Sequence, residues 1–274
     1  MTKQRRFRRT SRYIHIRWPI YIIVYGVLIG SLLLIGLSLA LGWYSFVPFS
    51  FVITLIASYL LVALGYVAYQ INDAPGKTPD ETLFSMAQTQ PNDRVVCIDL
   101  GLRETAVTIA QRLTTGEVTV IDIYNPQSNT DSALRRARDA ARKPPADPRL
   151  TWIDSSIDLL PLPDRSVSSV YMHQILSEFW LLDEQKQLLE EVFRILTPEG
   201  RLVVAEPIRS ESDLLLTGLI TYTLPTADHW RKLLQSAGFV VRREDTLHGL
   251  IYCVRVDKPS PSAGKQLQLQ LEFI

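Results

Sequence analysis

Carboxylate side chains recur at the ends of short apolar segments in the middle of this 274-residue chain. Asp99 and then Gly101 end the first segment, Asp122 the second and Asp154 the third, and Glu206 follows the fifth. An acid at the end of the second strand of an open parallel sheet is well placed to accept hydrogen bonds from ribose hydroxyls. Each acid taken singly fits a helix cap or a turn better. Their joint placement favours a cofactor that carries a nucleoside.

His173, at the end of the fourth apolar segment, is the best-placed titratable group for proton transfer. A histidine there can act as a general base if the reacting group must lose a proton. The alternative is a polar side chain that only satisfies the backbone of a loop. The two cysteines, Cys97 and Cys253, fall in predicted strands without metal-ligand neighbours. The sequence therefore predicts buried, reduced thiols in the cytosol and no metal site.

The elements that must position these residues alternate regularly after residue 90. Near-continuous apolar strands that alternate with helices are typical of an α/β fold with a mainly parallel sheet covered on both faces. In such a sheet, ligands bind at the carboxyl ends of the strands, near the point where the strand order reverses. The predicted strands are 94–100, 117–123, 150–153, 168–173, 201–205, 239–243 and 251–256, and the predicted helices are 105–113, 132–142, 183–196 and 226–237.

Residues 95–256 resemble the class I S-adenosylmethionine-dependent methyltransferases, the broad family that includes many small-molecule methyltransferases. The resemblance is carried by five segments in order: CIDLG (97–101), VIDIYNPQ (120–127), LPLPDRSVSSVYMHQIL (160–176), EVFRILTPEGRLVVAEP (191–207) and HWRKLLQSAGF (229–239). It implies a Rossmann-like, mostly parallel seven-stranded sheet with an antiparallel last strand. It also implies S-adenosylmethionine as cofactor, with Asp99 and Gly101 at the start of the cofactor loop and Asp122 on the ribose. Asp154 is the candidate acid on the adenine side, although counting back from Pro163 puts Ser156 there.

The cofactor loop departs from the family, which has three glycines at alternate positions. Only Gly101 remains here, and Arg103 and Thr105 occupy the next two places. Glycine permits a positive φ and a close approach of the backbone to the cofactor, whereas another residue forced into that geometry costs about 1–2 kcal/mol. Arg103 either pairs with the cofactor carboxylate or fills the pocket, and Thr105 is a candidate cap for the following helix.

The N-terminal part of the chain has a different character. The first 17 residues contain seven Lys and Arg and no acid, and no residue between Arg17 and Asp73 is charged. This uncharged block divides into two apolar stretches, 18–41 and 47–69, which predict a transmembrane helical hairpin. The basic tail places the N terminus and the C-terminal domain on the cytoplasmic side of a cell or organelle inner membrane. A cleaved signal peptide and a buried soluble hairpin are the weaker alternatives.

The expected organisation is therefore a basic tail (1–17), two membrane helices (18–71), a linker (72–90), a methyltransferase-like domain (91–257) and a C-terminal tail (258–274). We expect a membrane-anchored methyltransferase acting on a small molecule, with a lipid or a quinone as the natural acceptor class. The apolar stretch 214–224 is a candidate lid, interfacial element or core helix. The alternative is a catalytically degenerate accessory or scaffold subunit of a membrane complex, for which the alternating residues 267–273 could pair with a partner's sheet edge. Nucleic acid is not expected, because the chain after residue 17 is net acidic.

Overall fold

The computed structural model describes residues 8–142, 144, 146–209 and 221–260. The predicted lid at 214–224 lies mostly outside these residues, and the alternating segment 267–273 lies wholly outside them. The described residues divide into two compact units, one within 1–76 and 209–223 and the other within 77–208 and 224–274. Each unit is described by itself.

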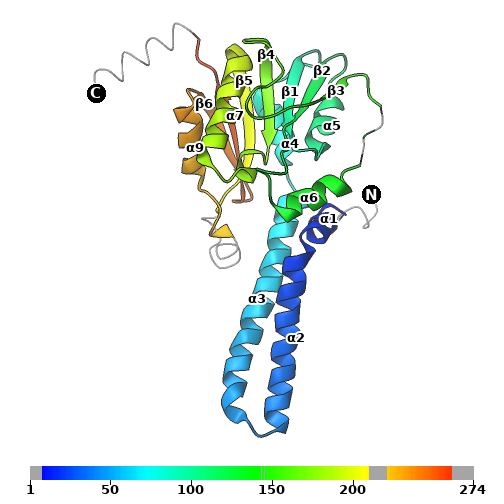
Figure 1. Ribbon diagram of the computed structural model, residues 1–274, viewed down its shortest axis with the longest axis vertical. Helices are drawn as coiled ribbons and strands as arrows, with labels where there is room; N and C mark the ends of the chain where they lie inside the picture. Colours follow the sequence, from blue (N-terminus) through cyan, green and yellow to red (C-terminus); the bar gives the residue numbers. More distant parts are fainter. Residues whose placement is uncertain (1–7, 143, 145, 210–220, 261–274) are drawn as a thin grey trace, which may run out of the picture. The chain divides into compact units, whose positions relative to one another are not determined.

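The first unit contains the helices α1 (Arg8–Ile16), α2 (Trp18–Ala40) and α3 (Val47–Asn72) (Figure 1), with the short 3-10 helix η2 (Tyr44–Phe46) before α3. The buried residues of α2 and α3 are serines, alanines and one valine. The Ser31 and Thr54 hydroxyls lie 2.8 Å apart across the pair. By length and composition, Trp18–Ala40 and Tyr44–Asn72 could cross a membrane, with mean hydropathies of 2.5 and 2.3. The two predicted apolar helices are therefore present, close to their expected limits.

The second unit is built on a seven-stranded sheet in the order β3-β2-β1-β4-β5-β7-β6. Its first five strands run parallel, and β7 is antiparallel to both β5 and β6. This confirms the mostly parallel seven-stranded sheet and its antiparallel last strand. The strands are β1 (Arg94–Asp99), β2 (Glu117–Asp122), β3 (Leu150–Asp154), β4 (Val167–His173), β5 (Leu196–Pro207), β6 (Val240–Leu247) and β7 (Ile251–Asp257).

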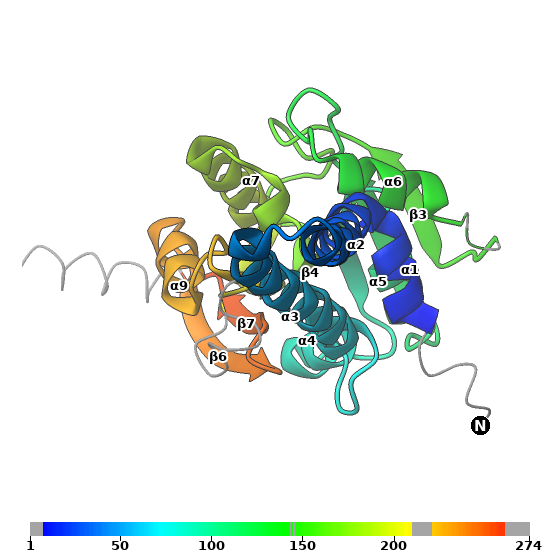
Figure 2. The same cartoon turned by 90° about the horizontal axis from the view of Figure 1, so that it is seen from below.

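Helices cover both faces of the sheet. Helices α7 (Leu182–Ile195) and α9 (Ala227–Ser236) pack on one face, while α4 (Pro79–Ala87) lies on the other (Figure 2). Right-handed crossovers place α5 (Glu104–Ala110), between β1 and β2, and α7, between β4 and β5, on opposite faces, because these two connections run in opposite directions along the sheet. Helix α4 contacts α5. One core cluster joins Val96 and Ile98 of β1 to α7 and α9. The remaining elements are α6 (Ser132–Ala140) and the 3-10 helix η3 (Leu176–Glu178).

Helix α4 lies inside the segment 72–90 that we expected to be a linker. It begins with a capping box in which the Thr78 hydroxyl accepts the Glu81 backbone N–H and the Glu81 carboxylate accepts that of Thr78. Leu83 and Met86 are buried, so the helix is part of the core of the sheet unit. The linker is therefore shorter than expected, and the Thr-Pro-Asp-Glu sequence was the signal for its end.

Candidate functional site

The sheet reverses its strand order between β1 and β4, and the expected site residues lie at the carboxyl ends of the strands around this point. Asp99 ends β1, Asp122 ends β2 and His173 ends β4. Asp99 and Asp122 are direct partners in the β1–β2 register, and Asp122 and Asp154 are partners in the β2–β3 register. The topology therefore brings the predicted acids to the edge of the sheet where ligands of such folds bind.

The loop after β1 keeps a glycine-type geometry although only one glycine is left. Gly101 has φ +80° and Arg103 has φ 68°, both in the left-handed region. The buried Asp99 carboxylate accepts the Arg103 backbone N–H at 2.9 Å, which closes the loop. Burial raises the pKa of Asp99, this backbone hydrogen bond opposes the rise, and the nearby Asp122 adds to it. Asp99 is thus a loop-shaping residue.

The Arg103 guanidinium lies 6.0 Å from the Trp152 ring centroid on β3, in a cation–π contact. Of the two roles open to Arg103, this contact supports neither a pairing with a carboxylate nor a filled pocket. Thr105 does not cap helix α5, because it lies within α5 and the N-cap residue is Arg103.

We expect Arg103→Gly to be about 1 kcal/mol more stable to unfolding than Arg103→Ala, because only alanine retains the cost of a left-handed backbone. Both variants lose the guanidinium, so the difference isolates the backbone geometry. The same pair at Arg135, inside α6, should show the opposite order, since glycine is unfavourable within a helix. Urea unfolding of all four variants measures these differences in stability. If the glycine and alanine variants ranked in the same order at both positions, the backbone of Arg103 would not be strained.

Asp122 is held by an arginine that the sequence did not single out. The Arg138 Nη1 atom on α6 donates to Asp122 Oδ1 at 2.8 Å, to Asp122 Oδ2 at 2.7 Å and to the Leu100 carbonyl at 2.7 Å. The same guanidinium stacks 4.1 Å from the Tyr124 ring centroid. It thus bridges the end of β2 and the loop after β1.

The residues present fit the nucleoside part of the expected cofactor. A Cβ atom added to Gly101 would lie 2.1 Å from Arg138 Nη1 and 3.0 Å from Asp122 Oδ2, so the bare face of Gly101 is turned toward the ribose-type acid. The guanidinium supplies Asp122 with the hydrogen-bond donors that two ribose hydroxyls would supply. The flexible end of the Arg138 side chain occupies the space between Gly101 and Asp122. Movement of this side chain would therefore free that space for the ribose. Asp122 and Gly101 would then hold the ribose side of S-adenosylmethionine.

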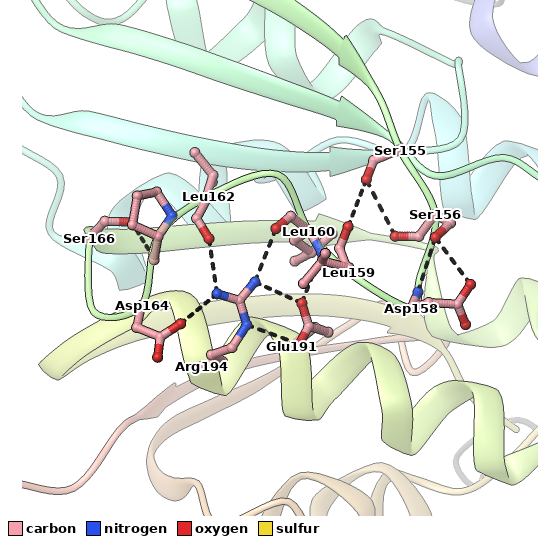
Figure 3. Close-up of polar contacts among 11 residues, drawn as sticks. Ser155, Ser156, Asp158, Leu159, Leu160, Leu162, Asp164, Ser166, Glu191 and Arg194 are labelled. Atoms are coloured by element: carbon pink, nitrogen blue, oxygen red, sulfur yellow. Dashed lines mark hydrogen bonds and ion pairs between the residues drawn. The ribbon is translucent and has the colours of Figure 1, made fainter.

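Asp154 is exposed at the end of β3, and its Cα is paired in register with that of Asp122. Ser156, the other candidate for the adenine side, is engaged locally. Its hydroxyl donates to Asp158 Oδ2 at 3.1 Å and accepts the Asp158 backbone N–H at 3.3 Å (Figure 3). The exposed carboxylate of Asp154 is therefore the more suitable group for the adenine side, while the hydroxyl of Ser156 stabilises a turn.

The segment before β4 is fixed by Arg194 of α7 (Figure 3). Its guanidinium donates to the carbonyl oxygens of Leu160 and Leu162 at 3.0 and 2.9 Å, and it pairs with Glu191 and Asp164. Glu191 in turn accepts the Leu160 backbone N–H at 2.8 Å. The LPLPD motif therefore has a structural role, in which one arginine satisfies backbone groups that no strand or helix pairs.

His173 belongs to a second polar cluster at the same end of the sheet. Its Nδ1 atom lies 3.0 Å from Asp80 Oδ1 and 3.0 Å from the Thr105 hydroxyl. The Thr105 hydroxyl donates to Asp80 Oδ1 at 2.9 Å. Asp80 is on α4 and Thr105 is on α5, so three separate elements converge on the imidazole.

Glu206 of β5 is fully buried and holds the chain just after His173. Its Oε1 accepts the backbone N–H groups of Ile175 at 2.9 Å and Leu176 at 2.7 Å, and its Oε2 accepts that of Ser177 at 3.2 Å. Burial raises the pKa of Glu206 even though these donors oppose the rise. This acid is therefore an anchor for the loop after β4.

Sequence reasoning missed Arg138 and Asp80. Arg138 is one of several arginines on α6, and only the fold shows which of them reaches Asp122. Asp80 lies within the capping sequence of α4, which by itself indicates a helix start. Within the described residues, no group of three His, Cys, Asp or Glu could hold a metal ion, and Cys97 and Cys253 are free and buried.

Residues 98–204 match the family model described as a methyltransferase domain. A protein of Mycolicibacterium smegmatis, described as a probable S-adenosylmethionine-dependent methyltransferase, is 36% identical over 104 residues. The aligned region is 36% of this chain and spans only 38% of the length of that relative.

Two solved structures are similar in fold. A SAM-dependent methyltransferase from Aquifex aeolicus has a TM-score of 0.49 and 18% identity, covering 66% of this chain and 89% of that one. The cyclase SpnF has a TM-score of 0.49 and 16% identity, covering 66% and 80%. The family match and the curated relative support the class I methyltransferase family for the sheet unit. They also support S-adenosylmethionine as its cofactor.

Proposed function

We propose that this chain is a membrane-anchored S-adenosylmethionine-dependent methyltransferase that acts on a lipophilic small molecule. The proposal is carried by one observation: the bare face of Gly101 turns toward the Asp122 carboxylate at the switch point of the sheet. The match of residues 98–204 to a methyltransferase domain supports it.

When bound, S-adenosylmethionine would supply a methyl group on a sulfonium sulfur, and a nucleophile that attacks the methyl carbon would displace the sulfur as a thioether. The chain's own residues bind and orient. Asp122 accepts hydrogen bonds from the ribose once Arg138 has released it, and Asp99 keeps the loop closed around Gly101. Asp154 is proposed to bind on the adenine side. The protein thus contributes mainly by holding the reactants in line at close range.

A lipophilic acceptor is supported by two features. Two helices are apolar enough to span a bilayer, which would keep the enzyme at its lipid substrates or at a quinone pool. In the sheet unit, Trp180, Leu181 and Leu182 are exposed, with Trp180 at 82%. These apolar side chains follow the loop that Glu206 holds after β4, close in sequence to the proposed site. The proposed orientation keeps the sheet unit on the cytoplasmic side, where the basic tail also lies.

The test is calorimetric titration of the detergent-solubilised full chain with S-adenosylmethionine and with its demethylated product. We expect Asp122→Ala to weaken binding about tenfold. The variant loses the hydrogen bonds between the ribose and the carboxylate. Part of that loss is offset, because the cofactor no longer has to displace Arg138 from a carboxylate. Glu117→Ala is the matched control, because Glu117 is an exposed acid at the opposite end of the same strand. Absence of binding by folded protein would favour the scaffold subunit instead, consistent with a carboxylate already occupied by Arg138.

A further inference from the structure

The hydrogen bonds around His173 assign its proton. The Thr105 hydroxyl gives its hydrogen to Asp80, so both Thr105 and Asp80 present only acceptors to the imidazole. The Nδ1 atom, 3.0 Å from each, must therefore carry a hydrogen. In the neutral ring, Nε2 is then the nitrogen with the free lone pair.

The Nε2 atom is buried and has no hydrogen-bond partner among the residues that the structure describes. A buried polar atom left without a partner is unfavourable, so each such atom in a native protein calls for an explanation, of which a catalytic role is one. Nδ1 is held by two acceptors, whereas the buried Nε2 has no partner among the described residues. That asymmetry is typical of an imidazole kept ready to take a proton from a bound molecule.

The position of the imidazole matches that use. His173 ends β4, next to β1 in the sheet, and Thr105 stands at the third alternate position of the loop that begins with Gly101. The imidazole and the cofactor loop therefore lie at the same place, where the strand order reverses, and Thr105, on the helix that follows the loop, contacts the imidazole. Glycine at position 105 could not make this contact, which gives the departure from the family pattern a physical reason.

The charges around the imidazole support a base that works above the ordinary histidine range. Burial lowers the pKa of His173, but the carboxylate of Asp80, and then those of Glu206 and Glu104, raise it by more. These carboxylates come from α4, β5 and α5, the elements around the ring. The protonated imidazole is stabilised after a proton is taken, and the free base is available only at pH above the raised pKa.

We propose that His173 is the base that removes the proton of a hydroxyl acceptor, a phenol or enol, and that Asp80 and Thr105 are its positioning residues. This rests on the proposed function. In the step, the acceptor oxygen forms a bond to the methyl carbon and its O–H proton passes to Nε2. The carbon–sulfur bond breaks with its electron pair going to sulfur, which leaves a neutral thioether and an imidazolium. A carboxylate acceptor, already ionised, has no need of this base.

The pairing of His173 with Asp80 is tested first, in the ligand-free full chain, by NMR with nitrogen-labelled histidine. The variant His173→Gln assigns the signal among the four histidines. We expect neutral His173 to carry its hydrogen on Nδ1 and to titrate above the ordinary value. In Asp80→Asn its pKa should fall by about 1–3 pH units, because the opposite charge is removed. Glu81→Gln removes a charge from the same helical turn and should leave the His173 pKa nearly unchanged. A hydrogen on Nε2 of neutral His173, or a His173 pKa that Asp80→Asn does not change, overturns the proposed pairing of His173 with Asp80.

The acceptor class is tested with methyl-labelled S-adenosylmethionine and a membrane lipid extract of the native host. We expect label that hydriodic acid releases as methyl iodide, as it does from methyl ethers, and label in carbon-bound methyl overturns the proposal. His173→Gln should lower kcat about 100-fold or more with little change in KM. In Asp80→Asn the rise of rate with pH should move to lower pH. Calorimetric binding of the cofactor without any labelled product overturns the hydroxyl acceptor, whereas absence of binding overturns the proposed function itself.

Discussion

Replacing Arg138 with alanine is expected to tighten the binding of S-adenosylmethionine by about 10- to 100-fold while lowering the stability of the fold. In the structure, Arg138 Nη1 donates to both oxygens of Asp122 and to the Leu100 carbonyl. The ribose must displace these hydrogen bonds, and hydrogen bonds to a charged group are worth about 1.5–3 kcal/mol. Without the guanidinium, no free energy is spent on moving Arg138 away from Asp122, so the form of the protein that can bind the cofactor is more populated.

The prediction is specific because Arg138→Ala is expected to raise the affinity for the cofactor while it lowers the stability of the fold. An arginine that contacts the cofactor would lose affinity on truncation, whereas an arginine that competes with it gains affinity. The stability of the unliganded protein should fall in either case, because Asp122 loses its partner. Arg135→Ala is the matched control, since Arg135 is exposed on the same helix and should change neither quantity. The two readouts are the calorimetric Kd and the urea midpoint, and weaker binding by Arg138→Ala would contradict the competition.

The sequence predicted the fold well because the central strands of this sheet are largely buried. In β1, residues 95–98 are all apolar, and every residue of the strand except Arg94 is buried. Such runs can be recognised without knowing what packs on them. The ends of these strands then place Asp99, Asp122 and His173 at one edge of the sheet. The elements that differ from expectation are short or irregular: α4 lies in the predicted linker, and β5 begins at Leu196, directly after α7.

The sequence could not predict which side chains meet at that edge. Arg138 reaches Asp122 across 16 positions, and Asp80 reaches His173 from a helix that precedes the whole sheet. Neither contact follows from a local period, because both depend on how helices lie over strands. The left-handed φ of Arg103 is an intermediate case. The position was recognisable from the spacing of the missing glycines, but its side-chain direction over Trp152 was not.

Glu206→Ala is expected to lower the free energy of unfolding of the sheet unit by about 3–5 kcal/mol. Glu206 is fully buried, and its carboxylate accepts three consecutive backbone N–H groups after β4. Truncation leaves these donors without partners, at about 1–3 kcal/mol each, although the loop relaxes in part. Glu190→Ala, at an exposed position on α7, should stay within about 0.5 kcal/mol of the wild type. Urea unfolding followed by tryptophan fluorescence measures both variants, and equal midpoints would show that the carboxylate does not hold the loop.

Glu206→Gln separates the charge of this residue from its size. Burial raises the pKa of Glu206 in the native state, so the folded protein holds the carboxyl proton more tightly than the unfolded chain does. That contribution is fully present below the ordinary glutamate pKa and is lost as the pH rises through the raised native value. Wild-type stability should therefore decline across this window, and Glu206→Gln should decline less, because its side chain does not ionise. Since His173 lies directly before the anchored loop, the same variant should also lower the pKa of His173 by removing a facing carboxylate. Urea midpoints measured against pH, together with the histidine titration, test both effects in one protein.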